Sequence, residues 1–246
     1  MRTQIFSLVS FLAFGTVQAA TTSNQSLRID LSWRASLDAQ GHVTQLQATR
    51  KERADRVPAI RQRLEQEILT WSFQPGTVND QPEPTETGLY VRADVSAGSD
   101  GTMKIRIVHA DVGGSWQKMT PPHYPGEAIR HHIAGEVVLQ IAYDSNGRTT
   151  EALPATTSPS TSKLLLDASE KATRTWKFSP EIVGGHAIAG TVVVPFCYTL
   201  HPMGSDRVEG KCDWKAPGRN DPLENGETLA LNPAAKLLTD VAGRTL

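Results

Sequence analysis

The sequence lacks several features that define common protein classes. Its 246 residues contain only two cysteines, and none of the G-x-S-x-G, H-E-x-x-H, P-loop or dinucleotide-binding motifs occurs in them. The formal net charge is −1 with a pI of about 6.7, and no polybasic run would bind nucleic acid or an anionic membrane. We therefore expect a protein that is not an enzyme, holds no cofactor and binds no nucleic acid.

What is present is compatible with a soluble globular protein. Apolar residues make up 39% of the chain and charged residues 21%. A chain of this length has room for one large domain or two small ones.

The N-terminal residues have the pattern of a secretory signal. Arg2 supplies one positive charge, Ile5 to Val17 form an uncharged apolar run, and Val17 and Ala19 are small enough for signal peptidase. We predict a signal peptide at residues 1–19 and a periplasmic location. The run is shorter than the roughly 20 residues of a bilayer span, which favours a cleaved signal. The alternative is an uncleaved inner-membrane anchor.

The two cysteines favour a disulfide. Cys197 and Cys212 are 15 residues apart, and an oxidising compartment preserves a bridge between them. Two cysteines are too few for a structural zinc site, which needs four ligands. The adjacent His131 and His132 would point about 100° apart on a helix, so we expect no metal there.

The first half of the chain alternates between strand and helix patterns. Leu27 to Leu37 alternate as a strand, and Val43 to Ala48 form the second arm of a hairpin. Apolar residues from Val57 to Trp71 then recur at steps of three and four, which predicts a helix. Strands are expected at Leu89–Val95 and Met103–Ile107. Residues 112–120 lose periodicity and are expected to be a linker.

The second half follows the same order. Val137 to Tyr143 alternate as a strand, and the turn Asp144-Ser145-Asn146-Gly147 accepts positive φ. A helix is expected from Leu165 to Trp176 and a last strand at Thr191–Thr199. Residues 201–246 are polar and rich in Pro and Gly, so we expect a tail with little structure.

The two halves share one motif. Trp71-Ser72-Phe73-Gln74-Pro75 corresponds to Trp176-Lys177-Phe178-Ser179-Pro180, 105 residues later, and each motif follows an Asp-x-x-Gly turn by about 30 residues. Large aromatic residues between a helix and a strand are typical of core packing. We predict an α+β protein of two tandem units, each a small antiparallel sheet covered on one face by one main helix.

The second unit carries a longer ordered pattern. Its parts are Pro122-His123-Tyr124-Pro125, Gly135-Glu136-Val137, Asp144-x-x-Gly147, Leu165-x-x-Ala168 and Trp176-Lys177-Phe178-Ser179-Pro180. In order and spacing, residues 121–200 resemble the C-terminal domain of the TonB energy-transducer family. Residues 27–110 resemble a diverged copy that keeps the turn and the aromatic motif but lacks the Pro-x-Tyr-Pro segment.

The resemblance implies a periplasmic domain that binds a partner by pairing a strand with an extended peptide. The implied partner is an outer-membrane TonB-dependent transporter or another envelope protein, and a homodimer is a further option. Two segments correspond to the family's contact regions and supply the expected partner-binding residues: Pro122, Tyr124 and Pro125, and Thr191, Val192, Val193 and Val194.

The resemblance does not extend to a complete transducer. Such a protein has an N-terminal anchor with a motor-contacting histidine, followed by a Pro-rich spacer. Residues 1–20 hold no histidine, and no such spacer follows. The alternative function is therefore a structural or scaffold protein of the cell envelope that transduces no energy.

Overall fold

The computed structural model describes residues 26–98, 102–155, 162–200 and 212–246. This part of the chain is mixed α+β, with mostly antiparallel sheets and few helices. The predicted signal peptide lies outside the described residues. None of the helices within those ranges has both the length and the apolar character that a membrane crossing requires.

The larger sheet comes mainly from the first half of the chain. Its order is β13-β12-β6-β1-β2, with β7 also paired to β6. Its strands are β1 (Leu27–Leu37), β2 (Val43–Ala48), β6 (Thr85–Ala97), β7 (Met103–Gly113), β12 (Ile182–Val183) and β13 (His186–Ala187). The four strands predicted from periodicity are all present, although β6 and β7 are longer than expected.

One long helix covers this sheet. The short α1 (Lys51–Ala54) precedes α2 (Pro58–Ile68), which has Pro58 in its first turn, where a missing amide costs nothing. Ile60, Leu64 and Ile68 recur on one side of α2. They are buried in the same cluster as Trp33 of β1 and Trp71, which follows the helix. The apolar stripe thus explains both the helix and its position.

The smaller sheet has the order β10-β9-β14-β15. Its strands are β9 (Gly135–Tyr143), β10 (Thr149–Pro154), β14 (Gly190–Tyr198) and β15 (Leu229–Ala230). Its helices are α3 (Gly126–Arg130) and α4 (Lys163–Thr173). The Ser162 hydroxyl accepts a hydrogen bond from the Leu164 amide at 3.3 Å and caps α4.

Three two-stranded pairs complete the structure. They are β8 (Ser115–Lys118) with β11 (Lys177–Ser179), β3 (Phe73–Gln74) with β16 (Lys236–Leu237), and β4 (Thr77–Val78) with β5 (Gln81–Pro82). The expected linker, residues 112–120, therefore contains the end of β7 and all of β8. A four-residue strand is too short to show periodicity, and its partner β11 lies about 60 residues later in the sequence.

The C-terminal tail is the main departure from expectation. Residues 212–246 contain β15 and β16 in place of the expected tail with little structure. Trp214, Ala216 and Leu223 are buried against Val138 and Val193 of the smaller sheet, and Ala235 and Val241 belong to the core of the first half. The apolar residues of the tail are too widely spaced in sequence to reveal this packing.

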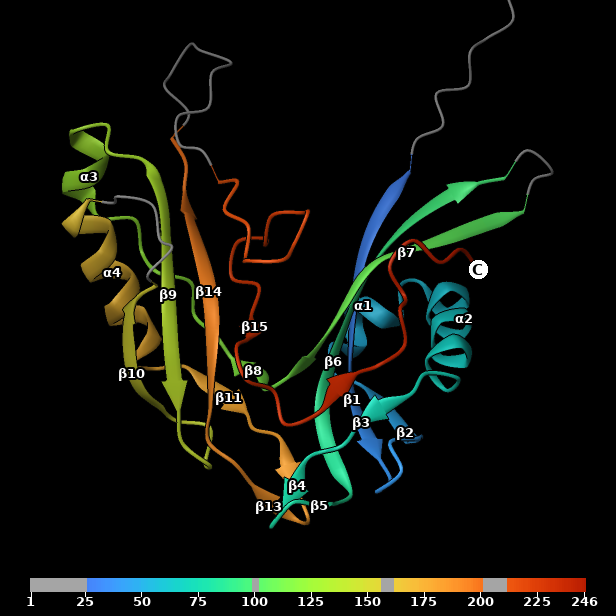
Figure 1. Ribbon diagram of the computed structural model, residues 1–246. Helices are drawn as coiled ribbons and strands as arrows, with labels where there is room; N and C mark the ends of the chain where they lie inside the picture. The colour runs from blue at the N-terminus through green and yellow to red at the C-terminus, as the bar shows by residue number, and fades with distance from the viewer. Residues whose placement is uncertain (1–25, 99–101, 156–161, 201–211) are drawn as a thin grey trace, which may run out of the picture.

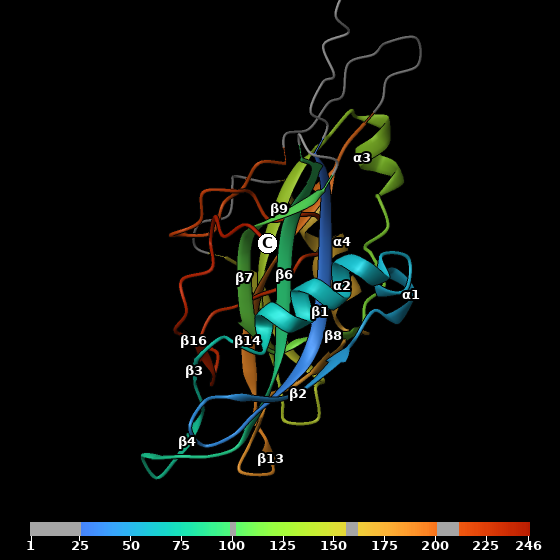
Figure 2. The same ribbon diagram turned by 90° about the vertical axis from the view of Figure 1, so that its right-hand side faces the viewer.

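The two halves interlock. The short strand β12 comes from the second half of the chain but pairs with β6 of the larger sheet, with Ile182 opposite Glu86 and Val183 opposite Thr85. In Figure 1 the two sheets stand face to face, with α3 and α4 outside one and α1 and α2 outside the other. Figure 2, turned by 90°, agrees in placing α2 on the outer side of β1 and β6.

The two Asp-x-x-Gly turns have the same local contacts. The amide of Phe73 donates to the carbonyl of Gly41 at 3.0 Å, and the amide of Phe178 donates to that of Gly147 at 2.8 Å. Both glycines have positive φ, +83° and +75°. A β-carbon on either one would overlap the carbonyl oxygen of the corresponding phenylalanine. Each turn is therefore locked against the Trp-x-Phe junction of its own half.

We predict that Gly41→Ala and Gly147→Ala each destabilise the protein by several kcal/mol, because the new methyl group meets a backbone atom that cannot move aside. The matched control is Gly185→Ala, which has φ +82° but nothing within 4 Å of the added carbon, so it should cost only about 1–2 kcal/mol of backbone strain. Urea unfolding of the three variants measures the difference. Equal losses at the three positions would contradict a steric lock.

Candidate partner-binding edge and the charged seam between the sheets

The predicted Pro-x-Tyr-Pro segment packs on one end of β14. The Tyr124 ring meets the Tyr198 ring edge to face, with centroids 5.1 Å apart. The Tyr124 hydroxyl donates to the Ile133 carbonyl at 2.8 Å. Pro122 and Pro125 are half-buried beside it. Tyr124 therefore anchors the segment to the smaller sheet.

The predicted strand residues lie at the opposite end of β14. Thr191 and Tyr198 are seven residues apart, or about 23 Å along an extended strand. Val192 and Val194 are fully buried in the core on the helix side, and Val193 packs against the tail on the other face. The structure thus separates the two predicted contact segments, and the valine side chains serve packing.

The tail already covers the outer edge of β14. β9 pairs with one edge of β14 along its full length. On the other edge, Val193 pairs with Leu229, and the Thr191 carbonyl accepts from the Leu231 amide at 3.0 Å. Further along this edge, two more outward groups are bonded: the Pro195 carbonyl to the Gly226 amide at 2.8 Å and the Cys197 amide to the Asn225 side chain at 3.2 Å.

The outer edge of β14 at Thr191–Val194 is therefore occupied by the tail, and the role of these residues in binding a partner stays a prediction. We call residues 225–231 the edge segment. Pro195 stands at an outward position and has no amide to satisfy, so the edge segment needs to supply only a donor there. The sequence did not reveal that the polar tail itself supplies β15, the strand that pairs with this edge of β14.

The predicted disulfide is present between Cys197 and Cys212, with 5.6 Å between the α-carbons. It joins the end of β14 to the beginning of the described tail. A covalent link between these elements keeps the tail close to the edge that it covers.

A cluster of charged residues lies between the larger sheet and the tail. We call it the charged seam; its members are Asp30, Tyr90, Arg92, His109, Asp111, Arg219, Asp221, Glu224 and Glu227. Sequence reading did not identify it, because its acidic residues come from distant strands and from a tail that appeared solvated.

Arg92 is the centre of the seam. Its side chain is 1% exposed, and its guanidinium donates to Asp30 at 2.7 Å, Asp221 at 3.2 Å and Glu227 at 2.9 Å. Burial alone would lower the pKa of Arg92, but the hydrogen bond to Asp30 and the nearby Tyr90 and Glu227 raise it above its ordinary value. A charged guanidinium on β6 therefore holds the tail to the sheet.

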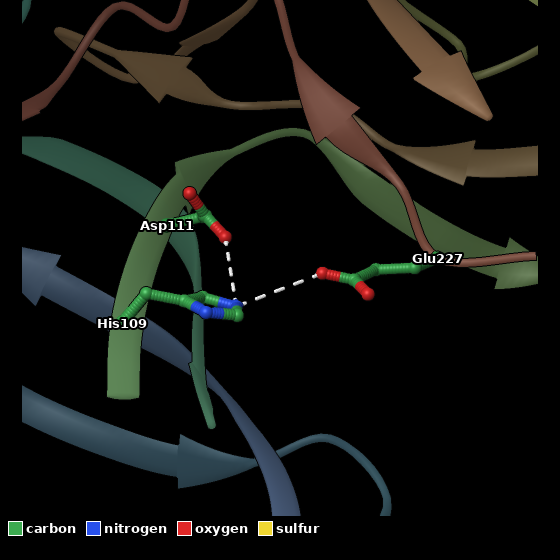
Figure 3. A group of neighbouring side chains, drawn as sticks. All are labelled: His109, Asp111 and Glu227. Carbon is green, nitrogen blue, oxygen red and sulfur yellow. Dashed lines mark ion pairs between the residues drawn. The ribbon is translucent and has the colours of Figure 1, made fainter. Parts of the chain in front are cut away.

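Figure 3 shows a second part of the seam, in which His109 and Asp111 project from β7 toward Glu227 of the tail. One potential ligand atom from each of these residues lies within 4.8 Å of the others, a chemically suitable set for a divalent cation. However, the Arg219 guanidinium donates to Asp111 at 3.0 Å and to Glu227 at 3.3 Å, and it also contacts His109. The cation that this set surrounds is an arginine, and the set therefore gives no support for a metal centre.

The charges around His109, Asp111 and Glu227 are consistent with Arg219 as the bound cation. Burial raises the pKa of the Asp111 carboxyl. Asp221 lies 3.2 Å from Arg219 and 3.1 Å from the His109 ring. The His109 ring contacts both Asp221 and the Arg219 guanidinium. The arrangement offers charge pairing but no nucleophile beside a base, so it supports a structural role.

We predict that Arg92→Met lowers the free energy of unfolding by about 3–5 kcal/mol, because the buried carboxylates of the seam lose their partner. Arg106→Met is the control, since Arg106 is 55% exposed and pairs with Asp94, and its loss should cost no more than about 1 kcal/mol. Chemical denaturation followed by tryptophan fluorescence measures both. A loss for Arg92→Met no larger than for the control would rule out a stabilising role of the seam.

Comparisons with known proteins bear on the second half of the chain. The family model described as the Gram-negative bacterial TonB protein C-terminal matches residues 120–200. Two curated relatives from Xanthomonas campestris pv. campestris, strains B100 and ATCC 33913, are named Protein TonB and are each 36% identical over 94 residues. The alignment covers 38% of this chain and 41% of each relative, so the chain spans less than half of their length.

A similar chain is also found among the solved structures. It is titled "Solution NMR structure of Pseudomonas aeruginosa TonB CTD" and shares 25% identity, with a TM-score of 0.31 over 36% of this chain and 88% of that one. The resemblance predicted for residues 121–200 from the motifs is confirmed by the family match. The diverged copy at residues 27–110 stays a prediction.

Proposed function

We propose that this chain is a periplasmic, non-catalytic protein that binds a partner in TonB-dependent transport across the outer membrane. The observation that carries the proposal is the match of residues 120–200 to the TonB C-terminal family, together with 36% identity to two TonB proteins over 94 residues. The proposed partner is an extended segment of an outer-membrane transporter or of another envelope protein. Residues 1–19 would serve in export, as a cleaved signal or as an anchor.

Residues 27–110 would be a diverged copy of the same unit. The support is geometrical: β1 lies between β2 and β6 as β9 lies between β10 and β14. The Gly41–Phe73 and Gly147–Phe178 hydrogen bonds also correspond. The exchange of β12 into the larger sheet would then hold the two copies together.

The proposed binding mode is strand exchange on β14. An incoming strand would displace the edge segment and replace its hydrogen bonds to Thr191, Val193 and Cys197 with equivalent ones. Because bonds are exchanged nearly one for one, the net cost of opening is small compared with breaking them without replacement. Tyr124 and the prolines beside it would form a second contact at the far end of β14.

If the protein is instead a scaffold, the edge segment would never leave β14. In a structural protein of the envelope, the edge segment would be the permanent partner of β14. A homodimer formed through β14 would also need the edge segment to leave.

We predict that Leu231→Pro binds transporter peptides about fivefold more tightly than the wild-type protein. The substitution removes the amide that donates to Thr191, which weakens the edge segment by about 1 kcal/mol. A second variant, Val193→Cys with Leu229→Cys, should lose binding when oxidised, because the new disulfide joins two paired residues and fixes the segment. Fluorescence anisotropy with labelled peptides from the N-terminal segments of TonB-dependent transporters measures the affinities.

Leu238→Pro is the matched control. It also removes one backbone hydrogen bond of the tail, from Leu238 to the Ser72 carbonyl at 2.9 Å, but it does not touch β14. Its affinity should equal that of the wild type. Equal binding by the oxidised double-cysteine variant would reject the edge as the site, and no binding by any variant would reject the transporter partner and leave the scaffold alternative.

A further inference from the structure

A cleft of about 810 Å³ lies among the larger sheet, β8 and the tail. Its wall includes Asp30 and Arg34 of β1, Arg50 and Arg53 at α1, and Trp116 of β8. A cleft of this size, with polar groups converging on it from several elements, is typical of a small-molecule site. Its wall also includes Asn225 to Thr228 and Ala230 of the edge segment.

Arg50 reaches across this cleft to Trp116. It is half-buried at the N-terminal end of α1, and its guanidinium carbon lies 4.2 Å from the centre of the Trp116 ring. Stacking on an indole holds the guanidinium plane but uses none of its N–H donors. The donors along the edge of the guanidinium therefore remain available to a ligand.

The charges that line the cleft are otherwise paired. Arg34 pairs with Glu86 at 3.3 Å, Asp30 with Arg92 at 2.7 Å, and Asp111 with Arg219 at 3.0 Å. Within residues 26–98, 102–155, 162–200 and 212–246, no carboxylate lies within 4.0 Å of the Arg50 or Arg53 guanidinium. Arg50 and Arg53 are therefore the arginines of the cleft wall that have no carboxylate partner within the described residues.

The environment of Arg50 favours an added anion. Burial first, and then the nearby charge of Arg53, lower the pKa of Arg50, and the smaller raising effects of Tyr90, Asp30 and Glu227 do not offset them. Both effects disfavour the charged side chain as it stands, and an anion beside the two guanidinium groups would offset them.

We propose that this cleft binds a small organic anion, whose carboxylate or phosphate group is held by Arg50 and Arg53 while its carbon skeleton lies beside Trp116. A guanidinium fork matches the two oxygens of a planar carboxylate, or two phosphate oxygens, in a bidentate contact. The site is formed with the edge segment in place on β14, and the inference does not depend on the proposed transporter partner.

The test uses the five tryptophan indole N–H resonances of the ¹⁵N-labelled protein. Trp116→Phe assigns the Trp116 signal. Glutarate and inorganic phosphate are titrated at constant ionic strength, and neutral glutaramide is titrated in parallel. The Trp116 signal should shift in a saturable way with glutarate, with phosphate or with both, and the comparison identifies the preferred oxyanion. Glutaramide should cause no saturable shift.

Three arginine variants make the result specific. Arg50→Gln should weaken binding at least tenfold, Arg50→Lys should have an intermediate affinity because it keeps the charge without the fork, and Arg174→Gln, at an exposed position after α4, should leave affinity unchanged. The four other indole signals report whether each variant is folded. The site is rejected if neither anion saturates the Trp116 shift, if glutaramide acts equally, or if Arg50→Gln binds as well as wild type.

Discussion

The hydrogen-bonding demand of strand edges organises this structure. Among the strands with an edge that no strand of the two main sheets fully covers are β14 and β7. Residues 225–231 bond to β14, and residues 243–246 bond to Ile105 and Ile107 of β7. One C-terminal segment therefore closes an edge of each sheet, which is a common requirement for a β protein to stay unaggregated.

The charged seam makes that closure specific. A short two-residue strand such as β15 gains little from its own hydrogen bonds. Arg92 and Arg219 add charge-assisted bonds to Asp221 and Glu227 on either side of the turn that leads into β15. The seam thus fixes the tail in one register beside the sheets, whereas apolar contacts alone would allow it to slide.

Features that depend on near neighbours in the sequence could be predicted. The hairpin turns at Asp38 and Asp144, the helix α2 and the core role of Trp71 and Trp176 all follow from patterns of a few residues. The disulfide followed from the cysteine count and the expected export.

Features that depend on distant pairing could not be predicted. The strand β8 carries no periodicity and exists because Lys177–Ser179 lie beside it. Glu227 looks like a solvated acid until Arg92, 135 residues earlier, is placed next to it. The edge of β14 seemed open because nothing in the sequence of the tail resembles a strand.

The position of the edge segment near the end of the chain has a consequence for folding order. Each sheet can form its local hairpins as soon as its own residues are available, but β14 keeps a bare edge until residues 225–231 arrive. Closure of contacts separated by more than 100 residues is slow, because the loop must be ordered before the contact is gained. Docking of the tail therefore covers an edge of each sheet, and a protein without residues 225–231 would present the bare edge of β14 to its neighbours.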